Sequence, residues 1–182
     1  MDPTIVARAQ RGDEEAFGLI VDSAGGRLHA VAHRILRDTD LAEDATQQAL
    51  LDIWRDLPDL RDPARFDAWS YRLLVRACHA EGRRMRRATP NLHLLPTDES
   101  TVEEGLSEVV DRDQLERGFR RLSLEHRAVV VLHHYLDMPL EQIAETLGVP
   151  PGTVRSRLHH AMRGLRAALD ADARPVAREV AG

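Results

Sequence analysis

The side chains of this sequence that could do chemistry are histidines and arginines. His29 and His33 are four residues apart, a spacing that puts two imidazoles on one helix face and permits joint binding of zinc. No glutamate follows His29, and no third ligand is close in the sequence. The pairs His133–His134 and His159–His160 each point to two different faces. We therefore expect no metal site.

The single cysteine, Cys78, excludes an intramolecular disulfide and a cysteine-built zinc site. It has no partner thiol, so a redox switch is not expected. The sequence also lacks a glycine-rich phosphate loop and a Ser-His-Asp spacing. These absences predict a protein that has no cofactor and is not an enzyme.

All 25 basic residues are arginine, whose planar fork matches phosphate groups and guanine edges. Residues 72–87 carry six arginines and one acid, and residues 151–169 carry four arginines and no acid. Acidic segments, 38–62 and 98–116, lie before each of them. The pattern indicates two places that contact a polyanion, although two solvated helix faces would give the same charges.

Composition favours helices as the elements that position these side chains. Hydrophobic residues make up 43% of the 182 residues and aromatic residues only 4%, which is typical of helical cores built from Leu, Val and Ala. The longest apolar run, Ala128–Leu132, is far too short to span a membrane. The amino terminus has no secretory signal pattern, so we expect a cytoplasmic protein without membrane insertion.

Residues 88–107 combine two prolines with polar and acidic residues and show little periodicity, as linkers do. They separate a first segment, 1–87, from a second, 108–170, and the remaining residues, 171–182, have no apolar face and form a tail. The predicted fold is all-α, with two small helical domains joined by a linker.

The second segment contains the pattern of a helix-turn-helix. Residues 140, 143, 144 and 147 are apolar at one-face helical spacing, and Gly148 suits the left-handed residue that ends a helix. Pro151 fits the first turn of the next helix. The apolar face of that helix consists of Val154, Leu158, Ala161 and Leu165, and a preceding helix would complete the core with Val129, Leu132 and Leu136.

The opposite face of the second helix is basic and carries no acid. It consists of Arg155, Ser156, His159, His160, Arg163 and Arg166. A helix of this kind enters the major groove with its early residues on base edges. The alternative is a plain helical hairpin, but solvated faces normally mix the two signs of charge.

The first segment contains a helix over residues 41–57. Its buried stripe is Ala42, Ala45, Ala49, Ile53 and Leu57, and its opposite face carries Asp44, Gln47, Gln48, Leu51 and Arg55, with Trp54 at the margin. An exposed leucine ringed by polar groups is typical of a protein-binding hot spot, although stray surface leucines are common.

The next helix, predicted over residues 63–87, combines a core stripe with a basic stripe. Phe66, Trp69, Leu73 and Ala77 form the core stripe; Arg65, Arg72, Arg76 and Arg83 lie beside it, with His79 adjacent. Arginines at the carboxyl end of a helix interact favourably with the helix dipole. A stripe four turns long extends beyond that end and would follow a phosphate backbone.

Together these blocks resemble bacterial sigma factors, especially the extracytoplasmic-function group. The segment SLEHRAVVVLHHYLDMPLEQIAETLGVPPGTVRSRLHHAMRGL is similar to region four, and DLAEDATQQALLDIWRDLPDLRDPARFDAWSYRLLVRACHAEGRR to region two. The resemblance implies a factor that binds core RNA polymerase and directs promoter-specific transcription initiation. The alternative is a stand-alone helix-turn-helix regulator, but two blocks in this order separate sigma factors from ordinary activators.

The resemblance also implies partners and site residues. Partners would be the coiled coil of the largest polymerase subunit, the flap of the second-largest subunit, promoter DNA and an anti-sigma factor. The polymerase-binding residues would be Asp44, Gln47, Gln48, Leu51 and Trp54. The DNA-binding residues would be Arg72, Arg76 and Arg83 at the minus-ten element and Arg155, Ser156, Arg157, His159, His160 and Arg163 at the minus-thirty-five element.

Three positions depart from the family pattern. Gln48 stands where a glutamate is usual, Arg76 where asparagine is frequent, and His160 where a basic residue is common. The helical angle of Arg157 puts it near the apolar edge, so we expect it to bind phosphate or a neighbouring helix rather than a base.

Overall fold

The structure is a computed structural model that describes residues 1–88 and 115–172, and every regular element in these ranges is helical. The first half, residues 1–88, contains α1 (Pro3–Ala9), α2 (Glu14–Leu36), α3 (Thr39–Asp56), two short 3-10 turns (Leu57–Asp59 and Pro63–Arg65) and α4 (Phe66–Ala88). The second half, residues 115–172, contains a helical stretch at 115–120, α6 (Leu124–Val130), a π-helical turn (Val131–Tyr135), α7 (Leu140–Leu147) and α8 (Pro151–Asp172).

Aspartate and serine side chains begin most of these helices. The carboxylates of Asp2, Asp13 and Asp38 accept hydrogen bonds from backbone N–H groups in the first turns of α1, α2 and α3, and the Ser123 hydroxyl does the same for α6. Such caps satisfy N–H groups that have no partner inside the helix and are each worth about 1 kcal/mol.

The first half is built around the apolar stripe of α3. All five predicted members of this stripe, from Ala42 to Leu57, are buried. α3 packs on α2 and on α4, which contributes the fully buried Phe66 and Leu74. The burial of all five residues confirms the predicted stripe. The small alanines on α3 allow the neighbouring helices to approach closely. Trp69 is half-buried and packs against the same core, beside Phe66.

The second half forms the predicted helix-turn-helix. α7 ends at Gly148, whose φ of 66° is left-handed, and α8 begins at Pro151. Ile143 and Ala144 of α7 are buried together with Val154, Ala161 and Leu165 of α8. α6 packs along α8 and contributes Val129. The all-α fold and the helix-turn-helix are therefore confirmed.

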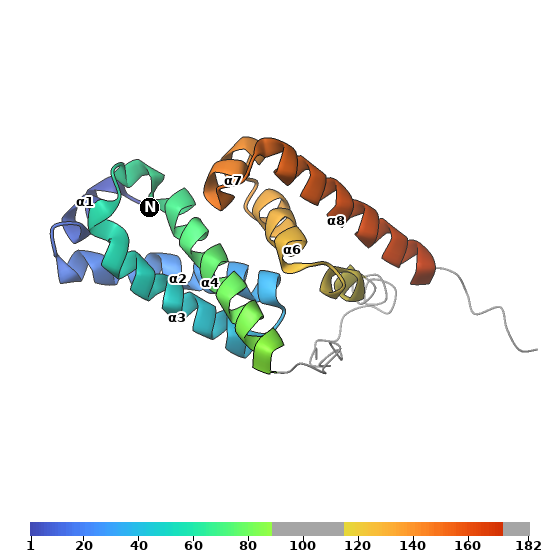
Figure 1. The fold of residues 1–182 in the computed structure, drawn as a ribbon. Coiled ribbons are helices and arrows are strands. Elements are labelled where there is room, and N and C mark those ends of the chain that lie inside the picture. Colours follow the sequence, from blue (N-terminus) through green and yellow to red (C-terminus); the bar gives the residue numbers. More distant parts are fainter. Residues whose placement is uncertain (89–114, 173–182) are drawn as a thin grey trace, which may run out of the picture.

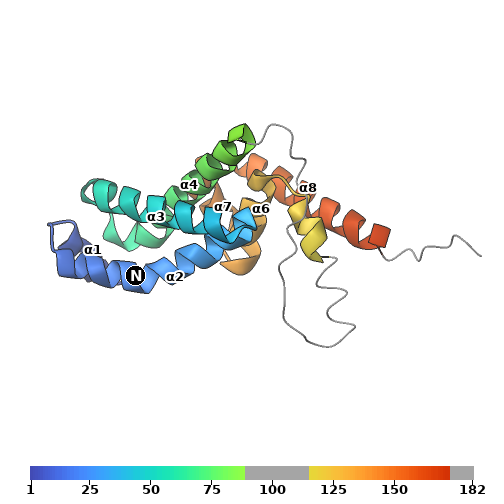
Figure 2. The same ribbon diagram turned by 90° about the horizontal axis from the view of Figure 1, so that it is seen from below.

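The two halves pack against one another, which the sequence did not predict. Figures 1 and 2 show α6 and α7 lying alongside α4, and α2 also contacts α6. Buried side chains from both halves form one continuous hydrophobic cluster, including Leu74 and Cys78 of α4 and Leu124 and Ala128 of α6.

One predicted helix begins later than expected, and two predicted segments lie largely outside the described residues. The helix expected from residue 63 begins at Phe66, because Pro63–Arg65 forms a 3-10 turn capped by Asp62. The predicted linker, 88–107, lies outside the described residues apart from Ala88, and so does the tail beyond Asp172. Within the described ranges, no helix combines the length and apolar character needed to cross a membrane.

Candidate polymerase and nucleic-acid interfaces

The outward face of α3 presents two large apolar side chains among polar ones. Leu51 is 62% exposed and Trp54 is 43% exposed, while Asp44, Gln47 and Gln48 are exposed on the same helix. The Trp54 ring packs edge to face on Phe17 of α2, with ring centroids 4.5 Å apart. The five side chains predicted for polymerase binding therefore all reach the surface of one helix.

Neighbouring charges hold two of these polar side chains. Arg84 Nη2 of α4 lies 3.3 Å from Asp44 Oδ2, and Gln48 Nε2 donates to Asp52 Oδ1 at 3.0 Å. Both contacts are exposed and therefore weak. A partner protein can exchange them for its own hydrogen bonds at little energetic cost.

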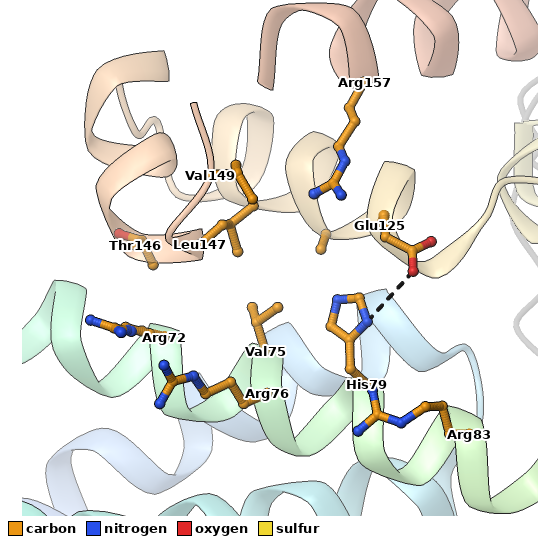
Figure 3. A pocket seen from close by; sticks show the side chains of 11 residues that line it. Arg72, Val75, Arg76, His79, Arg83, Glu125, Thr146, Leu147, Val149 and Arg157 are labelled. Atoms are coloured by element: carbon orange, nitrogen blue, oxygen red, sulfur yellow. Dashed lines mark ion pairs between the residues drawn. The ribbon is translucent and has the colours of Figure 1, made fainter. Parts of the chain in front are cut away.

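The predicted basic stripe of α4 forms one wall of a cleft between the halves. Figure 3 shows Arg72, Arg76, His79 and Arg83 projecting from α4 into a cleft of about 350 Å³. Arg65 is separate from this stripe, because it lies in the 3-10 turn before α4 and forms an ion pair with Glu145 of α7.

The second half supplies the other wall of the cleft. It consists of Glu125 and Ala128 of α6, Thr146 and Leu147 of α7, Val149, and Arg157 of α8. Arg157 is half-buried, and Figure 3 shows that its side chain points toward the α4 side of the cleft. Cationic side chains thus face one another across the cleft.

His79 and Glu125 meet across this cleft. The His79 Nδ1 atom lies 3.7 Å from Glu125 Oε1, and the two form an ion pair only when the imidazole is protonated. Burial lowers the pKa of His79, the Glu125 carboxylate opposes that effect, and Arg83, Arg157 and Arg86 add to it. The neutral imidazole is therefore favoured more than in a free histidine.

The outer face of α8 remains accessible in the packed arrangement. Arg155, Ser156, His159, His160 and Arg163 are all exposed. Arg155 Nη2 lies 3.2 Å from Glu141 Oε1 of α7, an exposed pair that orients the arginine at the start of α8. Arg163 Nη2 lies 3.4 Å from His160 Nδ1. Six of the predicted DNA-binding side chains lie on α8, and only Arg157 among them turns toward α4.

The structure also contains a basic cluster that the sequence patterns did not predict. Arg37 Nε donates to Glu116 Oε1 at 2.9 Å, and Arg120 Nε lies 3.0 Å from the same oxygen. Arg127 Nη1 donates to the Leu36 carbonyl at 3.1 Å, and the Arg34 guanidinium lies 3.8 Å above the Tyr135 ring. Arg127 and Leu36 are 91 positions apart in the sequence, so no local spacing could have revealed the cluster.

The paired histidines and the single cysteine are the other side chains whose chemistry the sequence raised. The His29 and His33 rings are stacked with centroids 6.4 Å apart, and in the described part of the chain no three His, Cys, Asp or Glu side chains converge as a metal would need. Cys78 is buried, which raises the pKa of its thiol to about 12. A thiol with so high a pKa is a poor nucleophile at neutral pH.

Family comparisons match both halves. Residues 20–88 match the model of sigma-70 region 2, and residues 112–165 match that of sigma-70 region 4. Similar proteins include the ECF RNA polymerase sigma factor SigL of Mycobacterium tuberculosis, 31% identical over 90% of this chain and 94% of that protein. The RNA polymerase sigma-H factor of Pseudomonas aeruginosa is 27% identical over 98% and 96% of the two chains.

Solved structures agree with these matches. CnrH, in complex with the cytosolic domain of CnrY, superposes with a TM-score of 0.66 at 27% identity, covering 94% of this chain and 99% of that one. The sigma factor RpoE of Bartonella quintana, in complex with the anti-sigma factor NepR, shares the fold with a TM-score of 0.67 at 20% identity, covering 89% and 98%.

An all-helical chain that carries region 2 and region 4 in this order is a sigma-70-type protein. Its likeness to SigL over nearly the whole of both chains places it more narrowly: it belongs to the extracytoplasmic-function RNA polymerase sigma factors. The chain is thus a sigma factor that directs transcription initiation. A stand-alone helix-turn-helix regulator is not favoured, because region 2 is present as well. Sigma factors are not a class of enzymes.

Proposed function

We propose that the outward face of α3 binds core RNA polymerase, at the coiled coil of its largest subunit. The observation that carries this proposal is the exposure of Leu51 and Trp54 within a polar ring formed by Asp44, Gln47 and Gln48. Exposed apolar anchors surrounded by polar groups are typical of binding hot spots. The second half would contact the flap of the second-largest subunit.

We propose that α4 binds the minus-ten element and α8 the minus-thirty-five element of the promoter. Arg72, Arg76 and Arg83 lie on one side of α4 and would contact phosphates along a strand. Arg155 and Ser156 lie in the first turns of α8, the part of a recognition helix that reaches base edges. His159, His160 and Arg163 continue the same face, and Arg157 would contact phosphate or a neighbouring helix rather than a base.

We also propose the limits of the two domains and a regulatory partner of this chain. Residues 1–87 would form the region-2 domain, 88–107 a linker, 108–170 the region-4 domain and 171–182 a tail. Because the similar protein CnrH was solved in complex with the cytosolic domain of CnrY, we propose that an anti-sigma factor binds this chain as well. We propose a cytoplasmic location and no catalytic activity of its own.

The test is run-off transcription with core polymerase on a promoter library. Wild-type protein should direct initiation from a restricted set of promoters. The double variant Gln47→Ala/Leu51→Ala should keep its helicity and lose binding to core polymerase, because truncated interface anchors commonly cost at least about 2 kcal/mol. An unchanged affinity of this variant for core polymerase would remove the assignment of the α3 face.

A further inference from the structure

Four arginines from the two halves of the chain face one cleft. Three of them, Arg72, Arg76 and Arg83, project into it from α4. The fourth, Arg157 of α8, points toward α4 from the opposite wall, as Figure 3 shows. The α4 arginines are exposed and Arg157 is half-buried, so a small solute can reach all four from solvent. The lining contains one carboxylate, that of Glu125.

The guanidinium groups of these four arginines have no counter-charge bound to them. Among the residues that the structure describes, none of the four side chains forms a hydrogen bond or an ion pair. Asp56, whose pKa is lowered chiefly by Arg55 and to a lesser extent by Arg76, forms its hydrogen bonds with Arg55. Glu125 faces His79. A cleft lined mainly by one sign of charge concentrates ions of the opposite sign.

The cleft has the size and the mixed lining of a small-molecule site. Its volume of about 350 Å³ lies at the lower end of the range for such sites, which is about 300–1,000 Å³. Apolar side chains also contribute from both halves, namely Val75 of α4, Leu147 of α7 and Val149. In Figure 3 Val75 lies opposite the other two. Small-molecule sites typically combine such apolar surfaces with a few charged groups that fix the ligand's orientation.

Phosphate is the anion that this arrangement matches best. A guanidinium group binds phosphate oxygens through two parallel hydrogen bonds, and here such groups lie on both walls. With His79 neutral, four arginines and one carboxylate leave a surplus of three positive charges. One phosphate group carries a charge of about −1.5 to −2 at pH 7. Two linked phosphate groups therefore balance the cleft, whereas one leaves part of its charge uncompensated.

We propose that this cleft is a binding site for a small anion with two linked phosphate groups, held by the α4 arginines on one wall and by Arg157 on the other. Neither half forms the site alone, because the guanidinium groups come from both. The site goes beyond the proposed function, since it takes a small molecule and needs neither polymerase nor promoter DNA.

Isothermal titration calorimetry of the free full-length chain, in magnesium-free buffer of constant ionic strength, tests the site with two probes. Inorganic pyrophosphate presents the phosphate groups alone, and ADP adds a nucleoside that the apolar side chains can contact. At least one probe should bind with a stoichiometry of one per chain. Tighter binding of ADP would identify a nucleotide as the ligand, and equal or tighter binding of pyrophosphate an inorganic anion. Binding of neither probe would overturn the proposal.

Single substitutions on the two walls locate the bound anion. Arg76→Ala and Arg157→Ala each remove one guanidinium group, from α4 and α8 respectively, and each should weaken binding about tenfold. The matched control is Arg87→Ala, because Arg87 is an exposed arginine of α4 that lies one turn beyond Arg83 and does not line the cleft. This control should bind the probe as tightly as wild type. Circular dichroism verifies that each variant is folded.

Two patterns of affinity among the variants would contradict the proposal. An equal loss in all three would show a response to net charge and not to a site. A loss in Arg76→Ala without one in Arg157→Ala would show that the anion binds the exposed side of α4 and does not bridge the cleft. None of these measurements includes DNA, so a failure of the proposed promoter contacts would appear separately, in transcription.

Discussion

The rings of Phe17 in α2 and Trp54 in α3 pack edge to face with their centroids 4.5 Å apart. This contact ties the exposed edge of α3 to α2 and fixes the orientation of Trp54. Leu51, one helical turn earlier, is 62% exposed. Trp54 therefore contributes to the packing of α3 on α2, whereas Leu51 is largely exposed. We propose that both side chains belong to the same binding face.

Single alanine substitutions should separate these contributions. Leu51→Ala should leave the free energy of unfolding within about 0.5 kcal/mol of wild type, as surface substitutions usually do. Trp54→Ala should lower it by at least about 0.5–1.5 kcal/mol, because the aromatic pair is lost. Both should weaken binding to core polymerase about tenfold or more. Urea unfolding and titration with core polymerase measure the two effects, and full polymerase affinity in Leu51→Ala would contradict the assignment.

Arg155 and Arg166 of α8 should affect promoter recognition in different ways. Arg155 lies in the first turns of the helix beside Glu141, and an arginine there can bind guanine through two hydrogen bonds worth about 1–3 kcal/mol of discrimination. Arg155→Ala should reduce transcription from the preferred promoter and flatten preference at one position. Arg166→Ala, three turns later, should weaken all promoters alike and reduce salt sensitivity.

Holoenzyme transcription on single-base variants of the minus-thirty-five element, at two salt concentrations, distinguishes these roles. If Arg155→Ala lowers transcription from every variant by the same factor, Arg155 binds phosphate and does not read a base.

The Cys78 thiol should be unreactive in the folded protein. It is fully buried in the core that the two halves share, and burial raises its pKa to about 12. At pH 8 a thiol reagent such as 5,5′-dithiobis-(2-nitrobenzoate) should leave the native chain unmodified and label one thiol per chain in denaturant. Stoichiometric labelling of the native chain would show that this core opens on the timescale of the reaction.

Acidification should destabilise the protein before its carboxylates titrate. Burial is the main cause that lowers the pKa of His33, His79 and His126 below the ordinary value of 6.5. The folded chain therefore binds fewer protons than the unfolded chain, so the stability held above pH 6.5 is lost as the pH falls through the lowered values. Asp56 and Glu125 have lowered pKa values and stay ionised in this range.

Urea unfolding at pH 7.5, 6.5 and 5.5 measures this loss. His79→Gln should show a smaller decrease in the free energy of unfolding over the same range, because one of the three imidazoles is gone. An equal decrease in wild type and variant would mean that His79 does not contribute to the loss of stability at low pH.

Local spacing in the sequence was sufficient to predict α3, α4, their faces and the helix-turn-helix, whereas α1 and α2 were not predicted. The buried stripe from Ala42 to Leu57, the turn at Gly148 and the exposed face around Arg155 all follow from a period of 3.6 residues and from backbone preferences. These features depend on neighbours within a few positions, which is the information that a single sequence displays. The resemblance to sigma factors rested on the same segments.

The tertiary structure alone decided how the halves meet. Gly82 lies against Leu124, Arg37 pairs with Glu116, and Arg65 pairs with Glu145, over separations of 42, 79 and 80 residues. Such contacts follow from the shapes of whole helix surfaces, and no local period records them. The orientation of Arg157 toward α4 has the same origin, because the angle of a residue on its helix does not say which surface packs opposite.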